Sequence, residues 1–153
     1  MKSKSKDSFE REIKFPHVEL DKLRDRLIDL EAERAGPSAF EDNWILDRDE
    51  ELLSTGRILR LRTDGGRARL TFKGPMHIEG NVKVREEWQL GGVTIALDHT
   101  PIGDFAEFEG DGAETVAKRC GFDPGKAERR SYLRLYEDYL KMNPDAPPEM
   151  VFR

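Results

Sequence analysis

The sequence is poor in cysteine, because Cys120 is the only one among 153 residues. A lone cysteine cannot form a disulfide within the chain, which is typical of proteins in a reducing compartment. Long hydrophobic runs are also missing: no stretch approaches the roughly 20 apolar residues of a membrane span, and the first residues lack the apolar stretch of a signal peptide. We therefore expect a soluble, cytoplasmic protein without membrane contact, in which residues 1–8 form a flexible tip and residues 9–153 form one domain.

An excess of positive charge is missing as well. The chain has 26 Lys and Arg residues against 31 Asp and Glu residues, for a formal net charge of -5. This balance disfavours a general nucleic-acid-binding surface, although it is compatible with a local basic pocket. Charged residues nevertheless make up 37% of the chain, so their positions along the predicted strands are the main indication of function.

The stretch Glu10-Arg11-Glu12-Ile13-Lys14, followed by Phe15 and Pro16, has the alternation of a β-strand. Successive side chains of a strand point to opposite faces, so Glu10, Glu12 and Lys14 share one face. Neighbours on that face are ~7 Å apart, which lets two glutamates converge on one divalent cation while the lysine meets an adjacent anion. The alternative is an edge strand whose charged face is solvated.

Two further strands are predicted at 58–63 and 67–73, because apolar and polar residues alternate in both and an Asp-Gly hairpin signal separates them. Their polar faces are almost purely basic. Like charges opposite each other across a hairpin are unfavourable, so this pattern favours an anionic ligand over the alternative of a sheet face turned to solvent. The basic residues are Arg60, Arg62, Arg67, Arg69 and Lys73.

Strands are also predicted at 40–47, 81–90, 93–98 and 104–110, and amphipathic helices at 18–34, 113–120 and from 123 onward. The strand at 81–90 has Lys83, Arg85 and Glu87 on one face, and the last strand has Glu107 and Glu109 on one face. If the antiparallel sheet curls into a barrel with these faces inward, the helices can cover its apolar outside. The sequence therefore predicts an α+β fold with an antiparallel β-barrel.

Such a barrel would bring the two glutamate pairs close together. Two carboxylates ~4 Å apart at an effective dielectric constant of ~20 repel each other by ~4 kcal/mol, so the four glutamates need compensating cations. Oxygen-only ligands suit Mg²⁺ or Mn²⁺. The basic residues in turn need a multiply charged anion, and a metal-bound triphosphate satisfies both requirements.

Six short motifs occur in a characteristic order between residue 10 and about residue 136. They are Glu10-x-Glu12-x-Lys14, Leu59-Arg60-Leu61-Arg62, Leu70-Thr71-Phe72-Lys73-Gly74, Arg85-x-Glu87, Gly103-Asp104-Phe105-x-Glu107-x-Glu109-Gly110 and Ser131-Tyr132. In these motifs the sequence resembles the CYTH, or triphosphate tunnel metalloenzyme, superfamily. The resemblance implies an antiparallel β-barrel tunnel, a divalent metal and a triphosphate substrate.

The resemblance also implies roles for individual residues. The metal would be bound by Glu10, Glu12, Glu107 and Glu109, with Asp98 as a further candidate ligand. The phosphates would be held by Lys14, Arg60, Arg62, Lys73, Arg85 and Arg130.

One segment of the family pattern is missing. Family members usually carry a helix and a further strand between the Arg-x-Glu strand and the strand that leads into the second glutamate pair. Here Arg85-Glu86-Glu87-Trp88 runs almost directly into Gly91-Gly92-Val93. We therefore expect a barrel that is one strand short or open on one side.

The leading hypothesis is metal-dependent hydrolysis of tripolyphosphate or a small organic triphosphate, with in-line attack by water. The catalytic residues would be Glu87, Glu109 and Lys14, where one of the two glutamates orients the water. Two alternatives stay open: a class IV adenylate cyclase that uses ATP, and a non-catalytic binder of polyphosphate or nucleotide. We expect a triphosphate ligand, no nucleic-acid partner, and a homodimer as one possible assembly.

Overall fold

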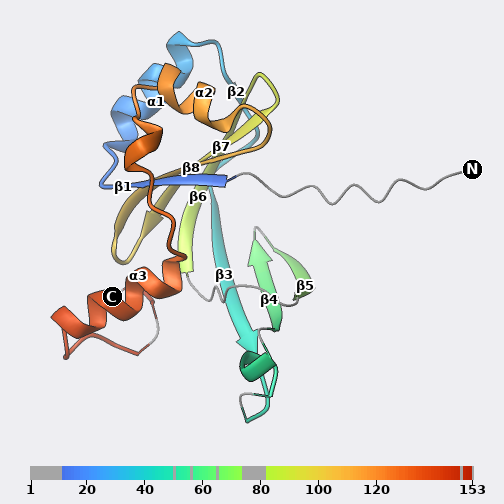
Figure 1. Cartoon of the computed structure of the whole chain (residues 1–153). Helices are drawn as coiled ribbons and strands as arrows, with labels where there is room; N and C mark the ends of the chain where they lie inside the picture. Colours follow the sequence, from blue (N-terminus) through green and yellow to red (C-terminus); the bar gives the residue numbers. More distant parts are fainter. Residues whose placement is uncertain are drawn as a thin grey trace, which may run out of the picture.

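The computed structural model describes residues 12–49, 51–55, 57–64, 66–73, 82–148 and 150–152. In these ranges the chain forms one sheet of eight strands with three α-helices, as Figure 1 shows. The strands are β1 (Glu12–Pro16), β2 (Glu33–Arg34), β3 (Ala39–Leu46), β4 (Ile58–Asp64), β5 (Arg67–Lys73), β6 (Val82–Leu90), β7 (Val93–Thr100) and β8 (Gly103–Glu109). The helices are α1 (Leu20–Asp29), α2 (Ala113–Arg119) and α3 (Tyr132–Met142), with short 3₁₀ turns η1 (Leu53–Thr55) and η2 (Pro124–Lys126).

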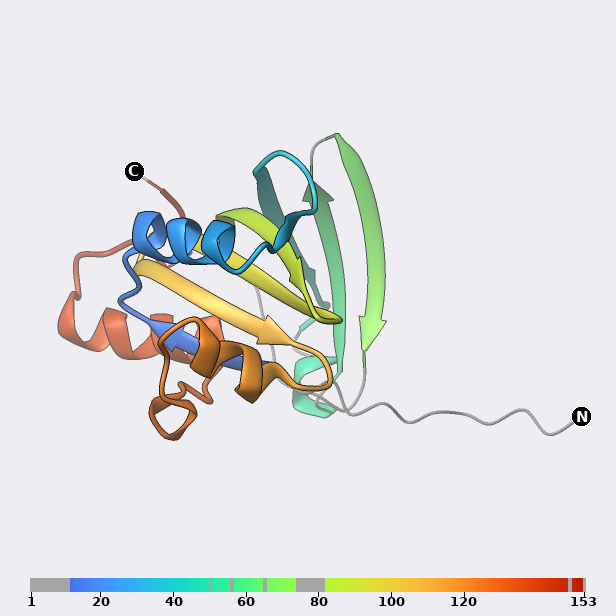
Figure 2. The ribbon, with the colours of Figure 1, turned by 90° about the horizontal axis from the view of Figure 1, so that it is seen from above.

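The described strands pair in the order β1-β8-β7-β6-β3-β4-β5, and β2 pairs with β6. Every pairing between them is antiparallel. The strands β1 and β5 stand at the two ends of this order, so the sheet does not close on itself. The curved, open arrangement is visible in Figures 1 and 2. It confirms the predicted α+β fold with a barrel that is open on one side.

Helices α1 and α2 cover one face of the sheet. Alternation along the strands places Phe15, Ile95 and Phe108 on this face, where they are buried with Leu27 of α1 and Ala117 of α2. The rings of Phe15 and Phe108 meet edge to face, with centroids 5.9 Å apart. Each apolar side chain of this size contributes about 1.5–3 kcal/mol when fully buried, so this layer is the main source of the fold's stability.

Helix α3 forms a second, smaller apolar cluster. The side chain of Ser131 accepts a hydrogen bond from the backbone N–H of Arg134 and so caps the helix. Tyr132 then packs edge to face on Phe105 of β8, with ring centroids 4.9 Å apart. Near its C-terminal end the chain returns to the fold, where Met150 is buried in this cluster. None of the described helices is both long enough and apolar enough to cross a membrane.

The first helix is shorter than the sequence predicts. The apolar spacing predicts a helix from residue 18 to residue 34, but α1 ends at Asp29, and Glu31 has a left-handed backbone with φ of 58°. Glu33 and Arg34 instead form β2, which pairs with Gln89 and Trp88 of β6. The physical reason is that the apolar stripe ends near Leu30, so the residues beyond it gain more from strand pairing than from helix packing.

Candidate active site

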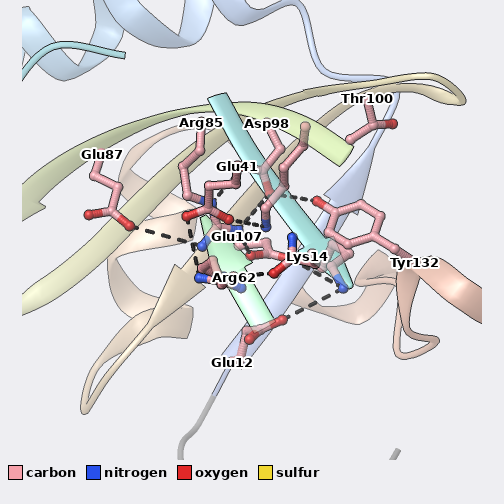
Figure 3. Close-up of polar contacts among 12 residues, drawn as sticks. Glu12, Lys14, Glu41, Arg62, Arg85, Glu87, Asp98, Thr100, Glu107 and Tyr132 are labelled. Atoms are coloured by element: carbon pink, nitrogen blue, oxygen red, sulfur yellow. Dashed lines mark hydrogen bonds and ion pairs between the residues drawn. The ribbon is translucent and has the colours of Figure 1, made fainter. Parts of the chain in front are cut away.

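A group of charged and polar side chains lies on the face of the sheet that α1 and α2 do not cover. Strand alternation places each of them on the opposite side from the apolar core. Lys14, Lys83, Asp98, Glu41 and Glu107 are buried, which is costly for a charged group unless it is paired. Figure 3 shows that the side chains point toward one another. We call this group the charged face; it comprises Lys14, Glu41, Asn43, Arg62, Lys83, Arg85, Asp98 and Glu107.

Asp98 is the most buried member of the charged face, with no exposed surface. Arg85 donates to both of its oxygens, from Nε over 2.7 Å and from Nη2 over 2.6 Å. The ammonium of Lys83 lies 3.2 Å from Asp98 Oδ2, and the hydroxyl of Tyr132 donates to the same oxygen over 2.8 Å. The bidentate contact fixes the plane of the guanidinium, so Asp98 sets the direction in which Arg85 points.

Glu107 is the second acidic centre of the charged face. Its carboxylate lies 3.2 Å from the ammonium of Lys14 and also accepts a hydrogen bond from Nη2 of Arg85. Burial alone would raise the pKa of Glu107, but the charges of Lys83, Arg85 and Lys14 outweigh burial and hold this pKa well below its ordinary value. Glu107 therefore stays ionised at neutral pH.

Glu41 and Asn43 extend the charged face onto β3. Glu41 lies 3.3 Å from Nη1 of Arg62 and 3.8 Å from the ammonium of Lys83. Arg62 also donates from Nε to Asn43 Oδ1 over 2.8 Å. These contacts join the basic strand β4 to the mixed cluster on β6, β7 and β8. The sequence predicts separate acidic and basic halves, whereas the structure interleaves the two signs.

Tyr132 lies against the ammonium groups of both buried lysines. The Nζ atom of Lys14 is 4.2 Å from the centroid of its ring, and that of Lys83 is 5.2 Å away. The ring therefore offers both cations a cation–π contact in a place that water does not reach. Burial, helped by the nearby negative charges of Glu107 and Asp98, raises the pKa of Tyr132 well above its ordinary value, so the hydroxyl remains a donor to Asp98.

The effect of removing only the Tyr132 hydroxyl on stability should be measurable. A hydrogen bond to a charged acceptor contributes about 1.5–3 kcal/mol, so we expect Tyr132→Phe to lower the free energy of unfolding by about that amount in urea titrations. Tyr139→Phe is the matched control, because it removes a hydroxyl from the exposed part of the same helix. Equal stability of Tyr132→Phe and the wild type would contradict the role assigned to the contact with Asp98.

The structure places the other predicted acidic residues at the border of the charged face. Glu12 is exposed and lies 3.6 Å from the ammonium of Lys14. Glu109 is opposite Glu12 in the β1–β8 pairing and is exposed as well. Glu87 is partly exposed and lies 4.0 Å from Arg85 Nη1. Glu10 lies outside the described residues, so its predicted role remains a prediction.

The predicted basic residues divide into two groups. Lys14, Arg62 and Arg85 are joined in the charged face, and Arg60 is on the same side of β4, two residues from Arg62. Lys73 ends β5, and its side chain lies outside the described part of the structure. The structure places the exposed Arg130 beside two other residues, with Nη2 2.6 Å from Glu128 and Nη1 2.7 Å from Asp138. A phosphate contact of Arg130 remains a prediction.

The carboxylate oxygens of this face are of the ligand type that suits a hard divalent cation. Glu41 Oε2 is buried and has no hydrogen-bond partner among the described residues, and a carboxylate oxygen is a preferred ligand of Mg²⁺ and Mn²⁺. The Lys14 ammonium lies close to both Glu12 and Glu107, which shows that this part of the face accommodates positive charge. No group of three or more His, Cys, Asp or Glu side chains in metal-binding geometry occurs within the described ranges, which exclude Glu10.

Sequence reasoning missed four residues of the site, which are Glu41, Asn43, Lys83 and Tyr132. Glu41 was detectable, because the predicted strand at 40–47 has Phe40 and Trp44 on one face and therefore Glu41 on the other. Lys83 was also detectable, because it shares the charged side of its strand with Arg85. Tyr132 is part of the Ser131-Tyr132 motif, but neither this motif nor helical spacing shows that its hydroxyl reaches Asp98.

Asp98 also differs from the expectation for a simple metal ligand. Both of its oxygens accept hydrogen bonds from Arg85, and Oδ2 is also engaged by Lys83 and Tyr132. These contacts favour a positioning role, in which Asp98 holds Arg85 and Lys83. Metal binding by Asp98 remains a prediction.

Comparisons with known proteins agree with the resemblance to the CYTH superfamily. A model of the CYTH domain family matches residues 8–83, and no curated protein matches the chain significantly. A crystal structure from Vibrio parahaemolyticus, described provisionally as an adenylate cyclase, is similar with a TM-score of 0.66 and 20% identity, over 84% of this chain and 98% of that one.

Two structures from Pyrococcus horikoshii OT3 are also similar. The PH1819 protein has a TM-score of 0.64 and 26% identity, over 87% of this chain and 99% of that one. The PH1012 protein has a TM-score of 0.61 and 20% identity, over 82% of this chain and 98% of that one. The family match and the shared fold show that this chain belongs to the CYTH superfamily, whose members are generally metal-dependent enzymes that act on triphosphates.

Proposed function

We propose that this protein hydrolyses tripolyphosphate or a small organic triphosphate with the help of Mg²⁺ or Mn²⁺. The observation that carries the proposal is the burial of Lys14 and Lys83, together with the partly buried Arg85, among carboxylates on one face of the sheet. Buried cations of this kind are well placed to bind a compact, multiply charged anion. The adjacent carboxylates are suited to the metal that accompanies a triphosphate.

Ligand binding is proposed to proceed by exchange of partners. Glu12, Glu107 and Glu109, together with Glu10 and Glu41, would hold the metal, while Lys14, Arg62 and Arg85 would turn to phosphate oxygens. Glu12, Glu41 and Glu107 would then exchange an internal cation for the metal. Each internal cation would exchange a carboxylate for phosphate. Because every charge keeps an opposite charge beside it, the exchange avoids the cost of an unpaired buried ion.

The hydrolytic step needs a positioned phosphoryl group and a water molecule. When bound, the metal supplies charge neutralisation on the phosphate oxygens. Lys14 and Arg85 would donate hydrogen bonds to the transferred phosphoryl group and stabilise the charge that it carries in the transition state. Glu87 and Glu109 are accessible to solvent, so either carboxylate could accept a hydrogen bond from the attacking water and orient it in line.

An adenylate cyclase is the second candidate, and the similarity to the Vibrio protein favours it. In that reaction the ribose 3′-hydroxyl of ATP attacks the α-phosphorus, which forms cyclic AMP and releases diphosphate. The open sheet leaves non-catalytic binding as a third outcome. Incubation with tripolyphosphate, thiamine triphosphate and ATP, each with Mg²⁺ or Mn²⁺, separates them: phosphate release supports hydrolysis, cyclic AMP supports the cyclase, and binding without turnover contradicts both enzymes.

Substrate and metal should stabilise the protein together. At tripolyphosphate and Mn²⁺ concentrations about 100 times the dissociation constant, binding adds about 2.7 kcal/mol to the free energy of unfolding. For a domain of this size that corresponds to a rise in Tm of roughly 5–10 °C by calorimetry. Adding EDTA should remove most of the rise and abolish turnover. An equal rise in Tm with and without EDTA would show that the anion binds without metal.

A further inference from the structure

Strands β3, β4 and β5 have a second face, opposite the charged face, that carries large apolar side chains exposed to solvent. The exposed fraction of each side chain lies between 40% and 62%. We call this surface the apolar face; it comprises Phe40, Trp44, Leu46, Leu70 and Phe72. Isolated exposed apolar residues are common, but a contiguous group on one sheet usually marks an interaction site.

The strand register shows that these side chains are contiguous. Leu46 is opposite Leu59, which is opposite Phe72 on the next strand. One step along the same face, Trp44 is opposite Leu61, which is opposite Leu70. Cross-strand neighbours on one face have Cβ atoms about 4.5–5.5 Å apart, so the two rows form a continuous surface. Trp44 lies in the second row, beside Leu61.

The helices of the described chain do not explain this surface. Figure 2 shows β4 and β5 on the side of the molecule away from α1, α2 and α3. Phe152 near the C-terminus reaches only the border of the apolar face, where its ring centroid is 6.5 Å from that of Phe40. The outer members of the two rows, Trp44, Leu46, Leu70 and Phe72, therefore remain exposed, although side chains of this kind gain about 1.5–3 kcal/mol each from full burial.

The charge pattern of the two sides favours face-to-face contact between identical surfaces. Among the described side chains of β3, β4 and β5 that point to the apolar side, Asp42 alone is charged, and it accepts a hydrogen bond from Trp44 Nε1 over 2.9 Å. Two copies of this face would therefore meet with little charge repulsion. By contrast, Arg67 and Arg69 on the other side of β5 are exposed and would repel each other if two β5 edges paired.

The extent of the apolar face also suits a dimer. A large side chain buries roughly 150–250 Å² when fully covered, so five half-exposed ones present on the order of 500 Å². A standard interface buries about 800 Å² per partner, with an apolar centre and a polar rim. We propose that a second copy of this chain covers the apolar face, in a symmetric dimer that packs the two β3-β4-β5 sheets against each other and has Trp44 near its centre.

Sedimentation of the full chain over a concentration series tests this proposal. We expect the wild type to form a dimer that dissociates on dilution, and Leu70→Glu to raise its dissociation constant at least about 100-fold, because each dimer loses two buried leucines and gains two buried charges. Phe72→Glu, in the other row, should act in the same way. Ile28→Glu is the matched control, because Ile28 is 59% exposed, as is Trp44, but lies on α1.

Tryptophan emission gives an independent readout on the same samples. The chain has two tryptophans, and Trp88 is buried in the core whereas Trp44 is exposed. Dilution of the wild type should shift the emission to the red as Trp44 becomes solvated, and Trp44→Phe should abolish the shift. Circular dichroism checks that each variant is folded.

Three results would overturn the proposal. The first is a wild-type mass that stays monomeric up to roughly 100 µM, where even a weak dimer would form. The second is a dimer that folded Leu70→Glu and Phe72→Glu variants retain, or that Ile28→Glu loses to the same degree. The third is a monomer that instead sediments with vesicles of phosphatidylcholine and phosphatidylserine, which would identify a lipid surface as the occupant.

Discussion

Replacement of Glu107 by glutamine is expected to lower kcat for tripolyphosphate hydrolysis roughly 100- to 1,000-fold, which is about the size of effect seen when an enzyme loses one electrostatic stabiliser of its transition state. Glutamine keeps the shape of the side chain but cannot carry the negative charge that lies beside Lys14 and Arg85. In the proposed mechanism that charge holds the metal, so the variant should also bind Mn²⁺ more weakly in calorimetric titrations.

Controls separate this effect from a loss of folding. Glu114→Gln changes an exposed glutamate on α2, away from the charged face, and should leave both kcat and Mn²⁺ affinity unchanged.

Because the pKa of Glu107 is lower in the folded protein than in the unfolded chain, its contribution to stability is present above about pH 4.3 and is lost as the pH falls toward the folded value. The wild type should therefore lose more stability than Glu107→Gln in this acidic range. A folded Glu107→Gln variant with a wild-type rate would contradict the metal role.

Most of the strands could be predicted from the sequence, because their signals are local. Apolar and polar residues alternate at 58–64 and 67–73, and the turn between them has a Gly that the hairpin needs. The same alternation places Lys14 on one side of its strand and Phe15 on the other, as the structure confirms. Periodicity therefore predicts which side chains share a face, although it does not show which strands are neighbours.

The contacts within the charged face depend on those neighbours. Lys14 meets Glu107 because β1 pairs with β8, and Lys83 meets Glu41 because β6 pairs with β3. Both pairings join segments that are far apart in the sequence. The family resemblance named Lys14 and Glu107 as site residues without predicting their contact, and it did not indicate Glu41. The end of α1 at Asp29 was also missed, because the pairing that forms β2 involves β6, more than 50 residues later.

Removing the carboxylate of Asp98 should have the largest effect on stability. We expect Asp98→Ala to lower the free energy of unfolding by about 3–5 kcal/mol, the usual cost of leaving buried ionic partners uncompensated. Lys83 and Arg85 would lose their shared anion, and the hydroxyl of Tyr132 would lose its acceptor. In urea titrations and calorimetry this should lower Tm by roughly 10 °C.

Two further variants test whether the loss of stability in Asp98→Ala comes from the buried charges. Asp104→Ala removes an aspartate whose carboxylate lies 2.6 Å from His99 Nδ1 in an exposed contact, and it should cost at most about 1 kcal/mol. Combining Asp98→Ala with Lys83→Met removes one of the stranded cations, so the double variant should be more stable than the sum of the two single changes predicts. Strict additivity would mean that Lys83 and Asp98 do not stabilise each other. It would also weaken the view that the charged face is a pre-formed network, in which Asp98 keeps Lys83 and Arg85 in position for phosphate.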